Sequence, residues 1–314
     1  MHKENIKAYI AWINVCIIWG TTYLAIRIGV KDLPPMLFAG VRWLAAGLIL
    51  LTFLKLKKYK LPSLKETRHI AVIGVLLLGF GNGLVVIGEK WVPSGLAALI
   101  ITTVPLWVVI IEVFIPGAPR INMQIILGLL IGFAGVTLIF WGNLGSIYRS
   151  AFITGAVCLA IAVFTWACGS LYSRYYTLKI HPLMSSAVQM LIAGPLQIIL
   201  GLMLGEAKGL TIELNGTLAL VYLIMFGSLI GYTSYIYAIS HLPVSFVTTY
   251  AYINPVIALC LGWLILDEKL SFTIILSAAV IFAGVALVKT GTDKETARRR
   301  AAAENKSIQN SFVE

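Results

Sequence analysis

Charged residues are scarce in this sequence. They make up 12% of its 314 residues, whereas an average soluble domain carries about 25%. A water-soluble globule of this length could not cover its surface with so few charges, and hydrophobic residues account for 59% of the chain. The same composition is unlike that of disordered, collagen-like or coiled-coil chains. An integral membrane protein is the class that remains.

Cysteine is also rare, and its pattern is typical of packing. The four cysteines Cys16, Cys158, Cys168 and Cys260 all lie in apolar runs, and none forms a CxxC pair. This spacing suits neither a disulfide framework nor a zinc site. We therefore expect no metal and no cofactor.

Sequence signatures of enzymes and pumps are absent. The chain contains no HExxH pair and no Walker sequence, which argues against a zinc protease and a nucleotide-driven pump. The run 227–231 reads Gly-Ser-Leu-Ile-Gly, which is not the G-x-S-x-G turn of serine hydrolases. We therefore predict that the protein is not an enzyme.

The excess of positive charge is concentrated beside the apolar runs. The net charge is +11, and basic residues cluster in 55–68 and 289–314. Lys and Arg next to membrane spans set topology and contact anionic headgroups. No nucleic-acid-binding motif accompanies these clusters, so the expected partners are the lipid bilayer and a small molecule, and not nucleic acid.

Ten apolar runs are long enough to cross a bilayer, for which a helix needs about 20 residues. We therefore predict an all-α membrane protein with ten transmembrane helices. The expected spans are Tyr9–Val30, Met36–Phe53, Ile70–Gly88, Ser94–Ile115, Met123–Trp141, Ala151–Tyr172, Leu183–Gly205, Gly216–Ala238, Val244–Leu266 and Phe272–Val288.

The distribution of basic residues predicts the orientation. With a cytoplasmic N-terminus, seventeen Lys and Arg residues fall on the inner side and six on the outer side. Positive charge is enriched in cytoplasmic segments. We therefore expect a multi-pass protein of the plasma or inner membrane with both termini in the cytoplasm.

The two halves of the chain repeat each other. Trp19 and Arg27 correspond to Trp166 and Arg174, each 147 residues later, and the Phe-Ala-Gly-Val run at 133–136 recurs at 282–285. Glycine and proline matches lie 150 residues apart: Gly81, Pro93 and Pro105 with Gly231, Pro243 and Pro255. The predicted organisation is a first five-helix repeat over residues 1–145, a second over 146–291 and a basic cytoplasmic tail over 292–314. Because five is odd, the second repeat enters the membrane from the opposite side, which gives an inverted repeat of the kind found in transporters.

Several short motifs resemble one family. Trp19-Gly20-Thr21-Thr22-Tyr23 is similar to the WGxxF/Y signature of the EamA-type drug/metabolite transporter superfamily. Further matches are Pro34-Pro35 followed by Phe38, Arg42 and Trp43, the run Pro93-Ser94-Gly95-Leu96-Ala97-Ala98-Leu99 with Pro105, Asn254-Pro255-Val256, Asp267-Glu268, and Phe282-Ala283-Gly284-Val285. The resemblance covers about residues 9–290. It implies two EamA-like repeats and outward movement of amino acids, their derivatives or other metabolites.

The chain departs from the family pattern at charged positions. Gly117 and Ala118 occupy the first-repeat position that matches Glu268, and Gln189 is the counterpart of Arg42. The pseudo-symmetry is therefore broken where charge is concerned, and the mode of ion coupling stays open.

Polar and aromatic residues at helical spacing suggest faces that turn towards a cavity. A polar residue in a span is costly and needs a reason, although small polar residues also serve helix packing. The candidate substrate-binding residues are Trp19, Thr22, Asn82, Thr102, Trp166, Tyr235, Tyr252 and Asn254. Their aromatic rings suit an apolar, aromatic or cationic ligand.

Three further residues are candidates for helix breaks and for ion coupling. Pro105 and Pro255 lie mid-span at matching positions, and matched helix breaks point to a transporter site, although a static kink is the alternative. Glu112 is the one acid well inside a span, either as a proton or cation site or as a structural group near the inner interface. Arg42 lies inside a span too and either extends to the outer interface or meets Glu89.

Small residues mark the fifth and tenth spans, with Gly128, Gly132 and Gly135 in one and Ala279, Ala283 and Gly284 in the other. Such spacing permits close helix approach. We interpret these faces as scaffold or as the surface of a homodimer.

Taken together, these patterns predict a secondary transporter that exports small metabolites or amphipathic drugs by alternating access, with proton coupling open. The alternative is an uncoupled facilitator or a channel-like pore, although no selectivity-filter motif is present.

Overall fold

Backbone amides and carbonyls inside a membrane have no water to bond, so a spanning segment must satisfy them within its own helix. The computed structural model follows this rule. It describes residues 3–92, 94–118, 121–140, 150–176, 179–209, 213–257 and 272–311, and within these ranges the regular structure is entirely helical.

The first half of the chain forms helices that match the first five apolar runs. Their bounds are α1 Lys3–Asp32, α2 Pro35–Leu56, α3 Leu64–Gly74, η1 Val75–Asn82, α4 Gly83–Gly88, α5 Ser94–Ile101, α6 Val104–Glu112 and α7 Met123–Phe140.

The second half repeats this order. Its elements are α8 Ser150–Tyr175, α9 Pro182–Met203, the short η3 Glu206–Gly209, α10 Leu214–Tyr222, η4 Leu223–Tyr232, α11 Thr233–His241, α12 Val244–Val247 and α14 Phe272–Ser311. The chain is also helical over residues 250–257.

Seven helices in the described ranges are long and apolar enough to cross a membrane, and Leu99–Glu112 and Met123–Leu138 are shorter apolar helices. The all-helical membrane fold is therefore confirmed. Residues 258–271 include the end of the ninth predicted span, together with Cys260, Asp267 and Glu268, and lie outside the described residues. The number of ten helices stays a prediction.

The third and eighth spans share an irregularity that the sequence pattern did not reveal. Each contains a stretch of π-helix, η1 in one and η4 in the other. These stretches end at Asn82 and Tyr232, which lie 150 residues apart. A π-helical turn is rare and occurs frequently at functional sites.

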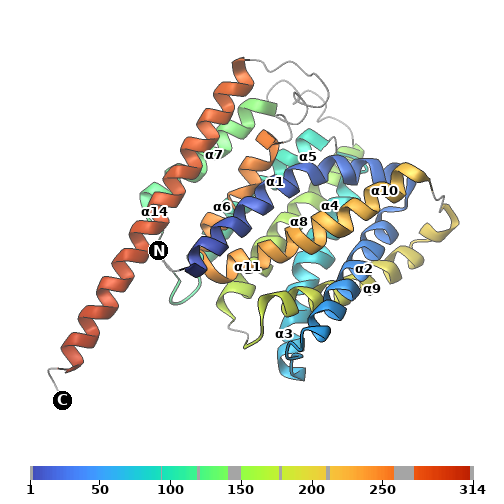
Figure 1. Cartoon of the computed structure of the whole chain (residues 1–314). Helices are drawn as coiled ribbons and strands as arrows, with labels where there is room; N and C mark the ends of the chain where they lie inside the picture. The colour runs from blue at the N-terminus through green and yellow to red at the C-terminus, as the bar shows by residue number, and fades with distance from the viewer. Residues whose placement is uncertain are drawn as a thin grey trace.

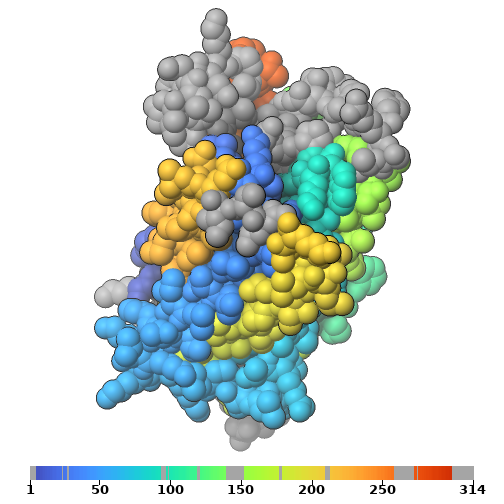
Figure 2. Space-filling model, turned by 90° about the vertical axis from the view of Figure 1, so that its right-hand side faces the viewer, coloured from blue at the N-terminus to red at the C-terminus, as the bar shows by residue number. Residues whose placement is uncertain are grey.

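Helices from the two halves pair with each other. The most extensive contacts join α2 to α9 and α7 to α14, and Figure 2 shows α2 in blue beside α9 in yellow on one face of the molecule. A Cβ atom added to Gly194 would lie 2.6 Å from the Leu44 backbone nitrogen, and one added to Gly284 would lie 2.5 Å from the Gly132 nitrogen. Glycine therefore allows both pairs to approach backbone to backbone.

The same contacts account for the small residues of the fifth and tenth spans. Gly128, Gly132 and Gly135 contact Gly284, Tyr252 and Ile281 within the chain. This surface is thus used for intramolecular packing, and a homodimer stays a prediction.

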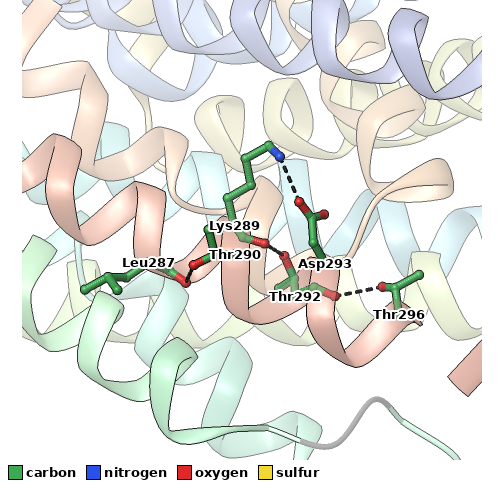
Figure 3. A network of polar contacts seen from close by, with 6 residues as sticks. All are labelled: Leu287, Lys289, Thr290, Thr292, Asp293 and Thr296. Atoms are coloured by element: carbon green, nitrogen blue, oxygen red, sulfur yellow. Dashed lines mark hydrogen bonds and ion pairs between the residues drawn. The ribbon is translucent and has the colours of Figure 1, made fainter. Parts of the chain in front are cut away.

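α14 is longer than its predicted span, which ended at Val288. It continues to Ser311 without interruption, so its C-terminal part extends away from the rest of the bundle in Figure 1. Figure 3 shows the polar contacts of this region: Lys289 pairs with Asp293 at 2.8 Å, and the hydroxyls of Thr290, Thr292 and Thr296 donate to carbonyls of their own helix. The basic tail predicted to begin at residue 292 therefore begins as helix.

Candidate functional site

Four aromatic rings meet where the two halves of the chain come together. Trp19 on α1 lies with its ring centroid 5.6 Å from Trp166 on α8, 5.2 Å from Tyr235 on α11 and 4.9 Å from Tyr250. Trp166 is 5.4 Å from Tyr235. We call these four residues the aromatic cluster. Such ring separations fall in the favourable range for edge-to-face and offset pairs.

The two tryptophans lie against matching glycines of the two π-helical stretches, although their hydrogen bonds differ. A Cβ atom added to Gly231 in η4 would lie 2.6 Å from Trp19 Nε1, and one added to Gly81 in η1 would lie 2.9 Å from Trp166 Cε3. Trp19 Nε1 donates to the Gly227 carbonyl at 3.2 Å, and Trp166 Nε1 donates to the Tyr235 hydroxyl at 3.0 Å. Each ring from one half is thus seated on a glycine of the other half.

A cavity of about 80 Å³ lies against the aromatic cluster. Its described lining residues are Trp19, Thr22, Ile26, Arg42, Trp43, Gly81, Asn82, Val85, Ile101, Val104, Ala162, Val163, Trp166 and Tyr250. They belong to α1, α2, η1, α4, α5, α6, α8 and the helical segment 250–257. The cavity is therefore built from both halves of the chain, with mostly apolar walls.

Polar groups gather on the α2 side of the cavity. Arg42 Nε donates to Ser228 Oγ at 2.8 Å, and the guanidinium carbon lies 4.3 Å from the centroid of the Trp43 ring. Trp43 Nε1 donates to Asn82 Oδ1 at 3.0 Å. These bonds link α2 to η4 and to η1, so the polar side of the cavity is fixed by the matched π-helical stretches.

Further contacts pack the helices together outside the cavity lining. Trp12 Nε1 donates to the Val247 carbonyl at 3.1 Å, and the Trp12 and Tyr9 rings pack on Phe246 with centroids 4.8 and 5.7 Å away. The Tyr232 hydroxyl donates to Gln189 Oε1, and both residues are fully buried. These contacts join α1 to α12 and α9 to η4.

The cavity brings together four of the predicted substrate-binding residues, namely Trp19, Thr22, Asn82 and Trp166. Tyr235 stands directly behind them and is fully buried, with its hydroxyl 2.5 Å from Ser170 Oγ. Its hydroxyl also accepts from Trp166 Nε1, and a role for Tyr235 in substrate binding stays a prediction.

The other three predicted residues lie outside the cavity lining. The Thr102 hydroxyl donates to the Leu99 carbonyl at 2.6 Å, and the Tyr252 hydroxyl donates to the Leu129 carbonyl of α7 at 3.1 Å. Asn254 is fully buried, and in the amide orientation that suits its neighbours its side-chain nitrogen donates to the Cys16 and Tyr250 carbonyls at 3.0 Å. These bonds satisfy the side chains within the protein.

In both spans that contain a candidate proline, the helix is interrupted by a turn that precedes the proline. Pro105 lies in the first turn of α6, directly after the turn at Thr102 and Thr103. Pro255 lies inside the helical segment 250–257, and the ninth span turns earlier, at Thr248 and Thr249.

The turn at Thr248 and Thr249 precedes Pro255 in the ninth span, and a role for Pro255 as a helix break stays a prediction. Each break coincides with a threonine pair: the hydroxyls of Thr248 and Thr249 donate to the Val244 and Phe246 carbonyls at 2.8 and 2.6 Å, and Thr103 donates to the Ile100 carbonyl at 2.7 Å. Such side-chain bonds compete with the backbone ladder of a helix.

Glu112 is 3% exposed and lies outside the cavity lining, at the C-terminal end of α6. The Tyr175 hydroxyl of α8 donates to its Oε1 atom at 2.5 Å, and Arg174 is near enough for an electrostatic interaction. Glu112 therefore joins α6 to α8 away from the polar side of the cavity. A role for it in coupling stays a prediction.

Arg42, Trp43 and Tyr250 line the cavity but were not among the predicted binding residues. Arg42 is 4% exposed and Trp43 is 2% exposed, so Arg42 does not extend to the interface. The available signal was the charge of Arg42 inside a span, since an intramembrane charge is a functional candidate by default. The direction of the Arg42 side chain could be determined only from the structure.

Comparison with known proteins gives consistent matches along the chain. The model of the EamA-like transporter family matches residues 6–141 and again residues 153–290. The chain is 40% identical over 290 residues to the uncharacterized inner membrane transporter YedA of Escherichia coli strain K12, covering 92% of each protein. It is 27% identical over 285 residues to the uncharacterized transporter YoaV of Bacillus subtilis strain 168, covering 89% of this chain and 96% of that one.

A solved structure shares the fold. It is titled only "Crystal structure of protein", and it matches with a TM-score of 0.76 and 21% sequence identity over 91% of this chain and 98% of that one. At this identity the likeness concerns the fold alone.

Proposed function

The chain belongs to the EamA-like transporter family and is a multi-pass inner-membrane transporter, and from this premise we propose that it exports small metabolites by alternating access. Amino acids, their derivatives and amphipathic drugs are the substrate classes that the sequence suggested. The family and the names of the relatives point to transport and not to catalysis.

The observation that carries this proposal is a cavity that lies between the two halves and is lined on one wall by residues of the aromatic cluster. Transporters with inverted repeats bind substrate at the interface of the repeats, near the membrane midplane. The cavity is lined by both halves of the chain, because α1 and α2 contribute Trp19 and Arg42 while α8 contributes Trp166. The separate family matches to 6–141 and 153–290 support two repeats over 1–145 and 146–291.

The pseudo-symmetry suggests how the opposite side would open. The lining residues Arg42, Asn82 and Val104 have Gln189, Tyr232 and Asn254 as their second-half counterparts, 147 or 150 residues later. All three counterparts are fully buried. In inverted-repeat transporters the two repeats exchange conformations around a central site. We infer that the inward-open state exposes Gln189, Tyr232 and Asn254 and closes around Arg42.

We place both termini in the cytoplasm, so that the cavity faces the outside. Cysteine at Lys208, which is exposed beyond α9, is then expected to react with an impermeant maleimide on intact cells. Cysteine at the exposed Lys60, between α2 and α3, is expected to react only after permeabilisation. The native cysteines are replaced first. The opposite pattern at both positions would reverse the orientation.

Counterflow in proteoliposomes tests the transport proposal. Vesicles preloaded with an unlabelled compound from a panel of amino acids and amphipathic drugs are expected to take up trace label faster than empty vesicles, because exchange returns a loaded carrier. We expect Trp19→Ala and Trp166→Ala to lower this rate about tenfold or more, while leaving the amount of folded protein similar. Each variant loses the apolar contact of a large ring with the substrate, worth about 1.5–3 kcal/mol when fully formed, and a tenfold change corresponds to about 1.4 kcal/mol.

Three outcomes would contradict the proposal in whole or in part. Uptake that preloading does not accelerate, and that rises linearly with concentration, indicates a channel-like pore. Normal counterflow in both tryptophan variants shows that these rings serve packing only. Carrier behaviour without accumulation against a gradient identifies an uncoupled facilitator.

A further inference from the structure

Arg42 is a buried cation that faces the cavity. It is 4% exposed and lies among the cavity-lining residues. Its Nε atom is bonded to Ser228 Oγ. An arginine carries four more N–H donors on its two terminal nitrogens, and these donate to none of the described residues.

The protein supplies no counter-charge for Arg42 among the described residues. The ion pair between two described residues is Lys289–Asp293, which lies on α14 and does not involve Arg42. Arg42 is also the one ionisable cation among the described lining residues, and that set includes no carboxylate. A charge inside a membrane normally pairs with an opposite charge or a cluster of acceptors, since an unpaired buried charge is strongly destabilising.

The position of the guanidinium is built and not incidental. Ser228 and the Trp43 ring hold it from two sides. A Cβ atom added to Gly227 would lie 2.8 Å from one of its terminal nitrogens, so the glycine leaves room for the group. A second donor belongs to the cavity lining: Asn82 accepts from Trp43 through its oxygen, and its amide nitrogen carries two further N–H donors.

We propose that the cavity binds the carboxylate of a monoanionic substrate, with the terminal nitrogens of Arg42 donating to both carboxylate oxygens. The planar guanidinium matches a carboxylate in this two-bond geometry. A single cation balances a single negative charge, which favours a monocarboxylate over a phosphate dianion. This inference rests on the proposed transport function and names the chemical class of its substrate.

The rest of the cavity selects an apolar body for this acid. Trp19, Trp166 and Tyr250 form an aromatic wall, and Ile101 and Val163 belong to the aliphatic lining. One water needs roughly 10–15 Å³ of cavity volume measured in this way. The cavity of about 80 Å³ therefore has room for a small organic acid. A cationic ligand, which the aromatic rings alone would suit, meets the positive charge of Arg42 instead.

The test compares three probes that share a ring and differ in the attached group: benzoate, benzamide and benzylammonium. Binding to the purified full chain in detergent is measured by quenching of tryptophan fluorescence and by the shift in melting temperature. The same probes are then examined as inhibitors of counterflow. The variants are Arg42→Gln and Arg42→Lys, with Arg68→Gln on the exposed part of α3 as the control that removes one distant positive charge.

We expect the wild type and Arg68→Gln to bind benzoate at least tenfold more tightly than benzamide, and benzylammonium most weakly. In Arg42→Gln the preference for benzoate over benzamide is expected to disappear, while benzamide still binds. Arg42→Lys is expected to keep part of the preference, because it retains the charge but not the fork of two donors. A change in the ratio of affinities cannot come from loss of folding, since both probes report on the same protein.

Three results would overturn this inference. They are a preference for benzoate that persists in Arg42→Gln, a wild type that prefers benzylammonium, and a wild type that binds none of the probes. The first assigns Arg42 to helix packing through Ser228 and Trp43. Each can occur while counterflow of another compound succeeds, so failure of the substrate class is distinguishable from failure of transport. The reverse case, benzoate selectivity without any counterflow, would refute transport and keep the anion site.

Discussion

Gly194→Val is expected to abolish recovery of folded protein. The Cβ atom of any side chain at this position would lie 2.6 Å from the Leu44 nitrogen, 2.9 Å from the Leu44 Cα atom and 3.0 Å from the Gly40 carbonyl oxygen. These are backbone atoms, which cannot rotate aside as the end of a side chain can. Separating α2 from α9 would loosen one of the two most extensive helix contacts. Overpacking typically costs about 1–3 kcal/mol and sometimes more, and valine adds two further methyl groups to this clash.

The matched control is Gly79 in η1, where an added Cβ atom would meet nothing nearer than Leu196 Cδ2 at 3.5 Å. Alanine substitution is compared at both positions by melting temperature in detergent and by the monodisperse fraction on size exclusion. We expect Gly79→Ala to be neutral or slightly stabilising, because alanine favours a helix over glycine by about 1 kcal/mol. Gly194→Ala should lower the melting temperature clearly. Equal melting temperatures for the two alanine variants would show that α2 and α9 can separate without loss of stability.

The helices could be predicted from the sequence because apolar runs of this length leave the backbone no other choice in a membrane. The placement of Trp19 and Trp166 at a common site also followed from the sequence, since their offset of 147 residues matches the repeat. The seating of each ring on a glycine 150 residues from its counterpart, at Gly231 and Gly81, is a tertiary contact. Such a contact becomes visible only when the halves are packed.

The prediction for Tyr252 depended on a continuous helix. Helical spacing from Ser245 places Tyr252 on the same stripe as Thr248, but the turn at Thr248 and Thr249 interrupts that register. Tyr252 consequently faces α7 and bonds to Leu129. Threonine side chains that bond to the preceding turn occur in many intact helices, so sequence alone gives no reason to place a break there.

Arg42 is a residue whose unusual character could be predicted from the sequence but whose partners could not. Its charge inside a span marked it as unusual, and its neighbours in the sequence favour no particular partner. Ser228, which orients it, lies 186 residues away. Whether such a charge snorkels to the interface, pairs with an acid or faces a cavity depends on packing between helices, which composition and periodicity do not encode.

Glu112→Gln is expected to abolish accumulation of substrate against a gradient while leaving exchange largely intact. If Glu112 carries the coupled proton, glutamine removes the titration and keeps a side chain of similar size that still accepts a bond from Tyr175, which lies 2.5 Å from Glu112 Oε1. Because Glu112 lies outside the cavity lining, substrate binding itself should be preserved. The measurement is uptake into proteoliposomes with and without an imposed proton gradient, using the compound with the strongest counterflow.

Glu112→Asp separates titration from packing. The aspartate keeps a carboxylate near α8 but is shorter, so it should retain part of the accumulation that glutamine loses. Tyr175→Phe removes the hydroxyl partner and provides a matched measure of the structural bond between α6 and α8. If Glu112→Gln still accumulates substrate, and if it lowers the melting temperature as much as Tyr175→Phe does, Glu112 is a structural residue near the inner interface. In that case coupling lies at another residue, or the protein is an uncoupled facilitator.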